Sequence, residues 1–247
     1  MKTFKTMLKT ELKLSIRGMD IFIFAICMPI VIVILLGIIY DNKPAFDGAD
    51  YTFLQQSFGA VSAIPICAGG LMGLPLVISD YRSKNILKRF KVTPISPHMI
   101  LFVQLAIYAI YSFVSLLLIY LVSSIFFDFR IAGSVFKYFL SFIFVMLAIF
   151  SIGLMVGGIA PNMKIAGVIA SILYFPMLIF SGATLPYEIM PVALQKFSNV
   201  LPLTQGIKLL KGTSLGLPLE NIFLPIFLMF IIIAICTFIS IRFFKWE

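Results

Sequence analysis

The side chains that could do chemistry gather outside the apolar stretches of this chain. Five cations lie within ten residues of one another in the segment SDYRSKNILKRFKVTPISP, residues 79–97; they are Arg82, Lys84, Lys88, Arg89 and Lys91. A charge at the centre of a bilayer costs at least about 2.5 kcal/mol. Because long apolar runs flank this segment, we expect it to lie in water at a membrane surface, where it can bind a soluble partner.

The same segment carries a short apolar face. Ile86, Leu87 and Phe90 fall at helical spacing, and Thr93 with Pro94 would end the helix. Such an amphipathic helix could insert into a groove on a cytoplasmic partner. The alternative is a solvated charge cluster that only orients the protein in the membrane.

Catalytic motifs are missing from the sequence. It contains no GxxxxGK[ST], no Gly-rich dinucleotide turn, no HExxH and no GxSxG. Cys27, Cys67 and Cys236 all fall inside apolar runs without metal-ligand spacing, and the single histidine is His98. We therefore expect no catalytic residue, no metal site and no cofactor in this chain.

Composition indicates an integral membrane protein. Of the 247 residues, 61% are hydrophobic and 12% are charged, about half the roughly 25% charge of an average soluble domain. No loop is long enough to bury a core of its own. Residues 1–247 are therefore expected to form a single transmembrane domain.

Six runs without Asp, Glu, Lys or Arg predict the membrane spans; they are residues 21–40, 51–79, 92–127, 138–163, 165–187 and 221–241. Each has at least the roughly 20 residues that a helix needs to cross the hydrocarbon layer. Pro94 and Pro97 move the start of the third span to about Met99. The predicted fold is all-α and polytopic, with six transmembrane helices.

Polar side chains inside the spans are few and uncharged. Those of the third run are candidates for lining a pathway: Gln104, Tyr108, Tyr111 and Ser112. Ion-coupled transporters usually place an ionisable residue near the midplane, and no span here has one. A nucleotide-independent secondary transporter or channel is therefore an alternative prediction, as is a non-transporting anchor or sensor.

Residues 1–18 carry two stripes at a spacing of four, which predicts an amphipathic helix lying in the membrane interface. The apolar stripe is Phe4, Leu8, Leu12 and Ile16, and the cationic one is Lys5, Lys9, Lys13 and Arg17. The alternative is a simple cationic flank of the first span.

Charge is divided unequally between the two sides that six spans define. One side receives both termini, the central segment and 13 of the 19 Lys and Arg residues, and it carries the whole net charge of +9. By the positive-inside rule this side is cytoplasmic. We therefore expect both termini in the cytoplasm, a location in the cytoplasmic membrane and no nucleic-acid partner.

Residues 186–212 form a second unusual stretch, on the opposite side. Two short amphipathic pieces, 192–201 and 203–210, are separated by turn residues; the stretch includes Pro186, Glu188, Pro191, Pro202 and Thr204. Pieces of this length are typical of re-entrant or interfacial segments. An ordinary external loop is the alternative.

Two glycine pairs, Gly69 with Gly73 and Gly153 with Gly157, have the spacing that lets membrane helices approach closely. They predict packing inside one bundle or, alternatively, self-association.

Taken in order, these segments resemble the membrane subunit of type-2 ABC exporters, the permease family of bacterial drug, polysaccharide and lipid-linked efflux systems. The resemblance is carried by KTFKTMLKTELKLSIR at the start, by SDYRSKNILKRFKVTPIS after the second span, and by FSGATLPYEIMPVALQKFSNVLPLTQGIKLLKG after the fifth. It covers essentially the whole chain, and the last segment, with its PLT turn, is the most specific.

The resemblance implies a half-transporter that pairs with a second permease copy or a close relative and with two separate ABC ATPase subunits, which bind ATP and Mg²⁺. Residues 80–97 would be the cytoplasmic coupling loop, with Asp80, Arg82, Ile86, Leu87, Arg89, Phe90, Thr93 and Pro94 facing the ATPase, and 186–212 the external re-entrant hairpin. Family members often have an E-R-E-x-G-T pattern in this loop, whereas here Asp80 is its only acid. That departure leaves the identity of the ATPase open.

We therefore expect an ATP-driven exporter whose path lies near the first, second and fifth spans. Since the spans offer no charge at their centres, the predicted cargo is an amphipathic or lipidic compound. Membrane lipids are also expected to contact the protein.

Overall fold

The computed structural model describes residues 2–18, 20–40, 43–46, 48–84, 86, 97–184, 187, 190–217 and 223–243. Within these ranges six helices are long and apolar enough to cross a membrane; they cover Ile23–Tyr40, Phe53–Ser83, Met99–Phe127, Val135–Ile159, Met163–Phe180 and Phe223–Arg242. β pairing in the described chain is limited to a bridge between Pro44 and Thr52. The predicted all-α fold with six spans is confirmed.

The chain order is α1 (Lys2–Gly18), α2 (Asp20–Phe22), η1 (Ile23–Cys27), α3 (Met28–Tyr40), α4 (Phe53–Cys67), η2 (Ala68–Gly73), α5 (Leu74–Ser83), α7 (Pro97–Phe127), α8 (Val135–Ile159), α9 (Met163–Phe180), α10 (Val192–Ser198), α11 (Pro202–Leu215) and α12 (Phe223–Phe243). The elements η1 and η2 are π-helical turns, so α2–η1–α3 and α4–η2–α5 each form one interrupted helix.

Prolines account for the positions of the two π-helical turns. A proline ring clashes with the carbonyl group four residues earlier in an α-helix. For Pro29 that residue is Ala25, inside η1, and for Pro75 it is Leu71, inside η2. The wider π-helical turn makes room for the ring without ending the helix.

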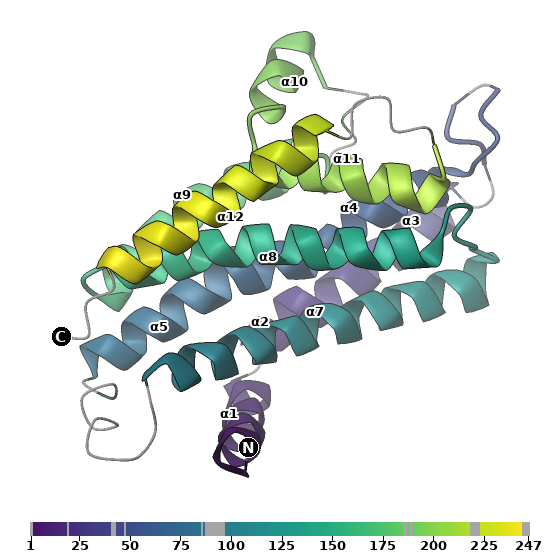
Figure 1. The fold of residues 1–247 in the computed structure, drawn as a ribbon. Helices are drawn as coiled ribbons and strands as arrows, with labels where there is room; N and C mark the ends of the chain where they lie inside the picture. The colour runs from purple at the N-terminus through teal and green to yellow at the C-terminus, as the bar shows by residue number, and fades with distance from the viewer. Residues whose placement is uncertain are drawn as a thin grey trace.

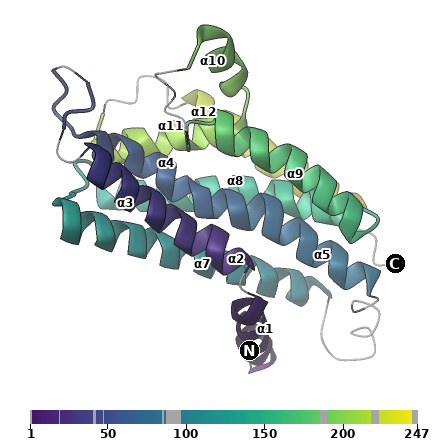
Figure 2. The same cartoon turned by 180° about the vertical axis from the view of Figure 1, so that it is seen from behind.

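The helix formed by α4, η2 and α5 is the centre of the bundle. Some 83% of its most apolar window is buried, whereas the corresponding windows of α9 and α12 are 28% and 22% buried. Figures 1 and 2 show α8 on one side of this helix and α3 and α9 on the other, with α7 along one edge. The second span is therefore the one that positions the others.

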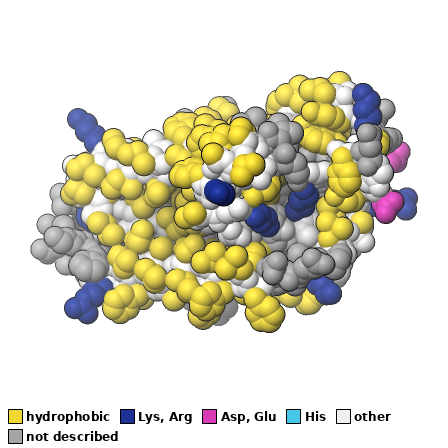
Figure 3. Space-filling view, turned by 90° about the horizontal axis from the view of Figure 1, so that it is seen from above, with side chains coloured by type: hydrophobic (Ala, Val, Ile, Leu, Met, Phe, Trp, Pro, Cys, Tyr) yellow, Lys and Arg dark blue, Asp and Glu magenta, His cyan; other side chains and the backbone are white. Residues whose placement is uncertain are grey.

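Apolar side chains cover the outside of the bundle. Exposed examples from the outer helices are Ile38, Ile125, Phe136, Ile172 and Phe230. Figure 3 shows hydrophobic side chains over much of the flank seen from above, with Lys and Arg near both ends of the view and a few in its middle. An apolar flank of this extent is the surface that lipid tails would cover.

Glycines let the helices approach closely within the bundle. A Cβ on Gly153 of α8 would come within 1.9 Å of the Gly70 carbonyl oxygen in η2, and one on Gly157 within 3.1 Å of Ile78. The ring of Tyr108 lies over Gly69 and Gly73. Both glycine pairs therefore pack against other helices of the same bundle. This is the first of the two alternatives predicted for them, packing within one bundle.

The two short amphipathic regions are also helical. In α1, Phe4, Leu8 and Leu12 pack against the core, while Lys5 and Lys9 are exposed. In the segment after the fifth span α11 continues to Leu215, five residues beyond the predicted end at 210. It ends at Gly216, whose left-handed φ of 69° is a common helix stop.

Candidate transport cavity and coupling region

A cavity of about 520 Å³ lies against the central helix at η2 and α5. Its remaining walls come from α1, the α2–η1 region, α7 and α9, so the first, second and fifth spans all contribute. The lining residues are Glu11, Leu14, Ser15, Gly18, Ile21, Phe24, Ala68, Met72, Gly73, Leu76, Val77, Asp80, Tyr81, Gln104, Tyr108, Met163, Tyr174 and Phe175. Most of these are apolar or aromatic, which is typical of small-molecule sites.

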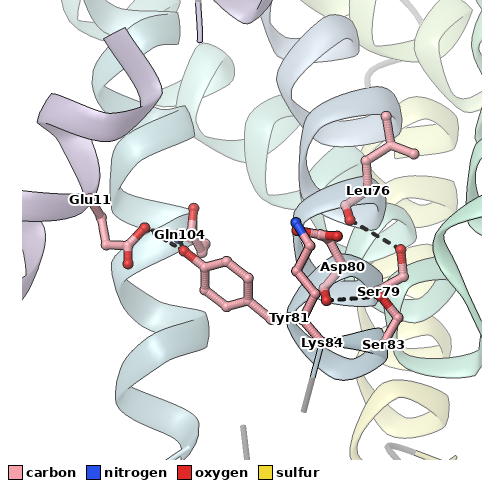
Figure 4. Close-up of polar contacts among 8 residues, drawn as sticks. All are labelled: Glu11, Leu76, Ser79, Asp80, Tyr81, Ser83, Lys84 and Gln104. Carbon is pink, nitrogen blue, oxygen red and sulfur yellow. Dashed lines mark hydrogen bonds and ion pairs between the residues drawn. The ribbon is translucent and has the colours of Figure 1, made fainter. Parts of the chain in front are cut away.

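Three helices meet through a polar cluster in the cavity wall. The Tyr81 hydroxyl of α5 donates to the Glu11 carboxylate of α1, and Gln104 Nε2 of α7 donates to the same carboxylate oxygen at 3.1 Å. Gln104 Nε2 also lies 3.1 Å from the Tyr81 hydroxyl oxygen. Figure 4 shows the Glu11, Tyr81 and Gln104 side chains converging. This cluster attaches α1 to the ends of the second and third spans.

The polar residues predicted as pathway lining divide into two groups. Gln104 and Tyr108 line the cavity. Tyr111 is buried and donates to Ser15 Oγ at 3.1 Å, which makes a second link between α7 and α1. Ser112 is fully buried in α7 and does not line this cavity.

Arg82 differs from what its sequence context predicts. The cationic segment was expected in water, yet only 7% of Arg82 is exposed. Its guanidinium group donates to the carbonyl oxygens of Gly158, at 2.9 Å, and Gly157. These carbonyls belong to the last turn of α8, where backbone acceptors lack helical partners and a cation complements the helix dipole. Those interactions offset the loss of hydration.

Lys84, two residues after Arg82, is at the surface. Asp80 forms an ion pair of 2.8 Å with Lys84, whose side chain is 64% exposed. Ile86 is partly buried. The other residues predicted to contact an ATPase, Leu87, Arg89, Phe90, Thr93 and Pro94, lie outside the described residues.

A second polar cluster joins α10 to α11. Ser198 and Thr204 are 3.2 Å apart through their hydroxyl oxygens, and Gln205 Nε2 donates to the Asn199 carbonyl oxygen at 2.5 Å. Pro191 and Pro202 stand at the starts of the two helices. Pro186 and Glu188 lie outside the described residues.

Lys208 belongs to this cluster. Its Nζ donates to Asn199 Oδ1 at 2.6 Å and lies 4.8 Å from the centre of the Tyr187 ring. Although the residue as a whole is exposed, partial burial of the ammonium group lowers the pKa of Lys208. The cation is used to hold the two helices together.

Glu11 and Tyr81 were not among the site residues predicted from the sequence. One local pattern could have indicated Glu11, because it lies three residues after Leu8 and next to Leu12 on the apolar side of the first helix. A carboxylate in that position needs a polar partner from another element. Tyr81 offered no comparable local indication.

Comparison with known proteins gives the family. The model of the ABC-2 type transporter family matches residues 2–215. The chain is also similar to Nodulation protein J of Rhizobium leguminosarum bv. viciae, 35% identical over 94 residues, and to Nodulation protein J of Neorhizobium galegae, 32% identical over 95 residues. Each alignment covers 38% of this chain and 36% of the relative. Since the family model spans most of the sequence, this multi-pass membrane protein belongs to the ABC-2 type transporter family, the membrane permeases of ABC transporters.

Proposed function

We propose that this chain is the permease subunit of an ATP-driven exporter that moves an amphipathic or lipidic compound across the cytoplasmic membrane. The cavity beside η2 and α5 is the main support. Residues of the first, second and fifth spans form part of its wall, and its lining is chiefly apolar. A guest with an apolar body would gain about 25 cal/mol for each Å² of apolar surface that it buries there.

In this proposal residues 80–97 are the coupling loop, and ATP with Mg²⁺ is bound by a separate ABC ATPase. Asp80 and Tyr81 line the cavity, and Arg82 in the same turn is bonded to the end of α8. A displacement of the coupling loop would therefore act on the cavity wall and on the fourth span together.

Two permease copies, identical or closely related, would face each other and complete the path. The pair α10 and α11, within residues 186–212, would form the external re-entrant hairpin. Exposed apolar residues on α10, such as Val192 and Phe197, would then rest in the outer membrane interface, and both termini would lie in the cytoplasm.

The test is affinity purification of the tagged chain from its native membrane in mild detergent, followed by a vanadate-sensitive ATPase assay. We expect an ABC ATPase to co-purify, and Phe90→Glu to reduce its recovery at least tenfold, about 1.4 kcal/mol of binding free energy. The matched control is Phe46→Glu, because Phe46 is exposed in the α3–α4 connection. It should leave recovery unchanged.

A partner-free, nucleotide-inactive oligomer would contradict the proposal and favour a secondary transporter or an anchor. Transport of a small inorganic cation by the reconstituted complex, with no effect of hydrophobic compounds, would contradict the proposed cargo.

A further inference from the structure

The cavity contains a carboxylate, that of Glu11, for which the described residues supply no ion-pair partner. Glu11 Oε2 accepts both hydrogen bonds of the polar cluster, and Glu11 Oε1 accepts none from the described residues. The ion pair found among those residues joins Lys84 to Asp80. Glu11 is partly buried, and a carboxylate that has lost part of its hydration is stabilised by an opposite charge.

The surroundings of Glu11 favour a bound molecule with a positive charge. None of the described residues that line the cavity is Lys or Arg, and the second acid among them, Asp80, already has Lys84 as its partner. An anionic guest would therefore meet a net negative wall, whereas a cationic guest would supply the missing countercharge.

Aromatic rings line the same cavity. Tyr108 and Tyr174 are almost fully buried in α7 and α9, while Phe24 and Phe175 are partly exposed. Ring faces attract cations, and their apolar bodies accept hydrocarbon. A carboxylate with aromatic and apolar walls is the chemistry that recognises a hydrophobic cation.

We propose that this cavity binds an amphipathic monocation, with its positive group at Glu11 and its apolar body over the rings of α7 and α9. The inference rests on the proposed function and narrows its cargo to hydrophobic compounds carrying one ammonium-like charge. The volume of about 520 Å³ lies in the range of sites for drug-sized molecules.

A purely mechanical role for Glu11 makes a different prediction. If Glu11 only attaches α1 to α5 and α7, a glutamine could still accept hydrogen bonds from Tyr81 and Gln104. Glu11→Gln therefore removes the charge while keeping an acceptor of the same shape, and Glu11→Asp keeps the charge. The two roles are therefore distinguished by measuring whether the cavity prefers a cation, and not by measuring stability.

The probes are tetraphenylphosphonium and tetraphenylborate, hydrophobic ions of similar size and opposite charge. Binding is measured by equilibrium dialysis on the purified complex in zwitterionic nanodiscs, with empty nanodiscs subtracted. We expect the cation to bind at least tenfold more tightly than the anion. Glu11→Gln should weaken cation binding at least tenfold, and Glu11→Asp should weaken it less than threefold. Asp50→Asn, an exposed carboxylate outside the cavity, should have no effect.

Equal binding of the two ions, or cation binding unchanged by Glu11→Gln, would overturn the inference, as would absence of binding by either ion. Recovery of the ATPase is measured in the same wild-type preparations. If the ATPase is recovered without a preference for the cation, only this inference fails. If no ATPase accompanies the wild-type chain, the proposed function fails.

Discussion

Arg82 shows how a single charged side chain can be assigned to the wrong environment by its neighbours in sequence. It stands in a cluster of cations, yet its guanidinium group is buried against the last turn of α8. The planar group can donate to two carbonyl oxygens at once, which a lysine ammonium group does less well. Arg82 therefore joins the ends of the second and fourth spans.

Replacing Arg82 tests this role. Arg82→Ala removes two charge-assisted hydrogen bonds and leaves the Gly157 and Gly158 carbonyls without their donor, so we expect the free energy of unfolding to fall by about 2 kcal/mol or more. Unfolding in mixed detergent micelles, followed by circular dichroism, measures this change. Lys84→Ala is the control, because an exposed ion pair contributes only about 0–1 kcal/mol. Equal losses for the two variants would refute the assignment.

At the scale of the elements, the close packing of α8 on η2 depends on the lack of a side chain at Gly153. The Gly70 carbonyl oxygen occupies the place where a Cβ of residue 153 would be. The two helices can therefore come close only with glycine at this position.

Gly153→Ala should force α8 away from η2 and reduce the free energy of unfolding by about 1–3 kcal/mol. Gly167→Ala in α9 is a matched control, since the nearest atom to its new Cβ would be 3.5 Å away. There the better helix propensity of alanine should leave stability unchanged or raise it by up to about 1 kcal/mol. Thermal melting in detergent compares the two. If Gly153→Ala melted like Gly167→Ala, the close contact would be disproved.

At the scale of the whole molecule, the bundle has two polar ends and an apolar flank. The end of α5, the loop between α8 and α9 and the C-terminal end of α12 lie at one end (Figure 1). The α7–α8 connection lies at the other, where Gly133 N donates to the Ser214 carbonyl oxygen at 2.8 Å. When each helix crosses the membrane, successive connections must lie on opposite sides. The positions of these connections agree with that requirement.

Labelling with a membrane-impermeant maleimide tests the proposed orientation. Cys27, Cys67 and Cys236 are first replaced by alanine, and Lys84→Cys or Arg130→Cys is then introduced at the two exposed ends. The positive-inside rule predicts that Arg130→Cys reacts in intact cells and Lys84→Cys only in inverted vesicles. The reverse pattern would show that the assigned orientation is wrong.

The sequence by itself determined the spans, because the length of an apolar run reflects directly the thickness of hydrocarbon that it must cross. It predicted the third span to begin near Met99, and α7 begins two residues earlier, at Pro97. It also indicated helices at residues 1–18 and within residues 186–212. These are local properties, set by composition and spacing within a few turns of one helix.

Only the tertiary structure decided which segments meet. Glu11 and Tyr81 are 70 residues apart, and Glu11 and Gln104 are 93 apart, yet they share one hydrogen-bonded cluster. Arg82 likewise finds its acceptors 75 and 76 residues away. Local polarity indicates whether a segment prefers water or lipid, but a partner for a buried charge depends on how whole helices pack. The cavity and the position of Glu11 in its wall arise from that packing, which no single segment encodes.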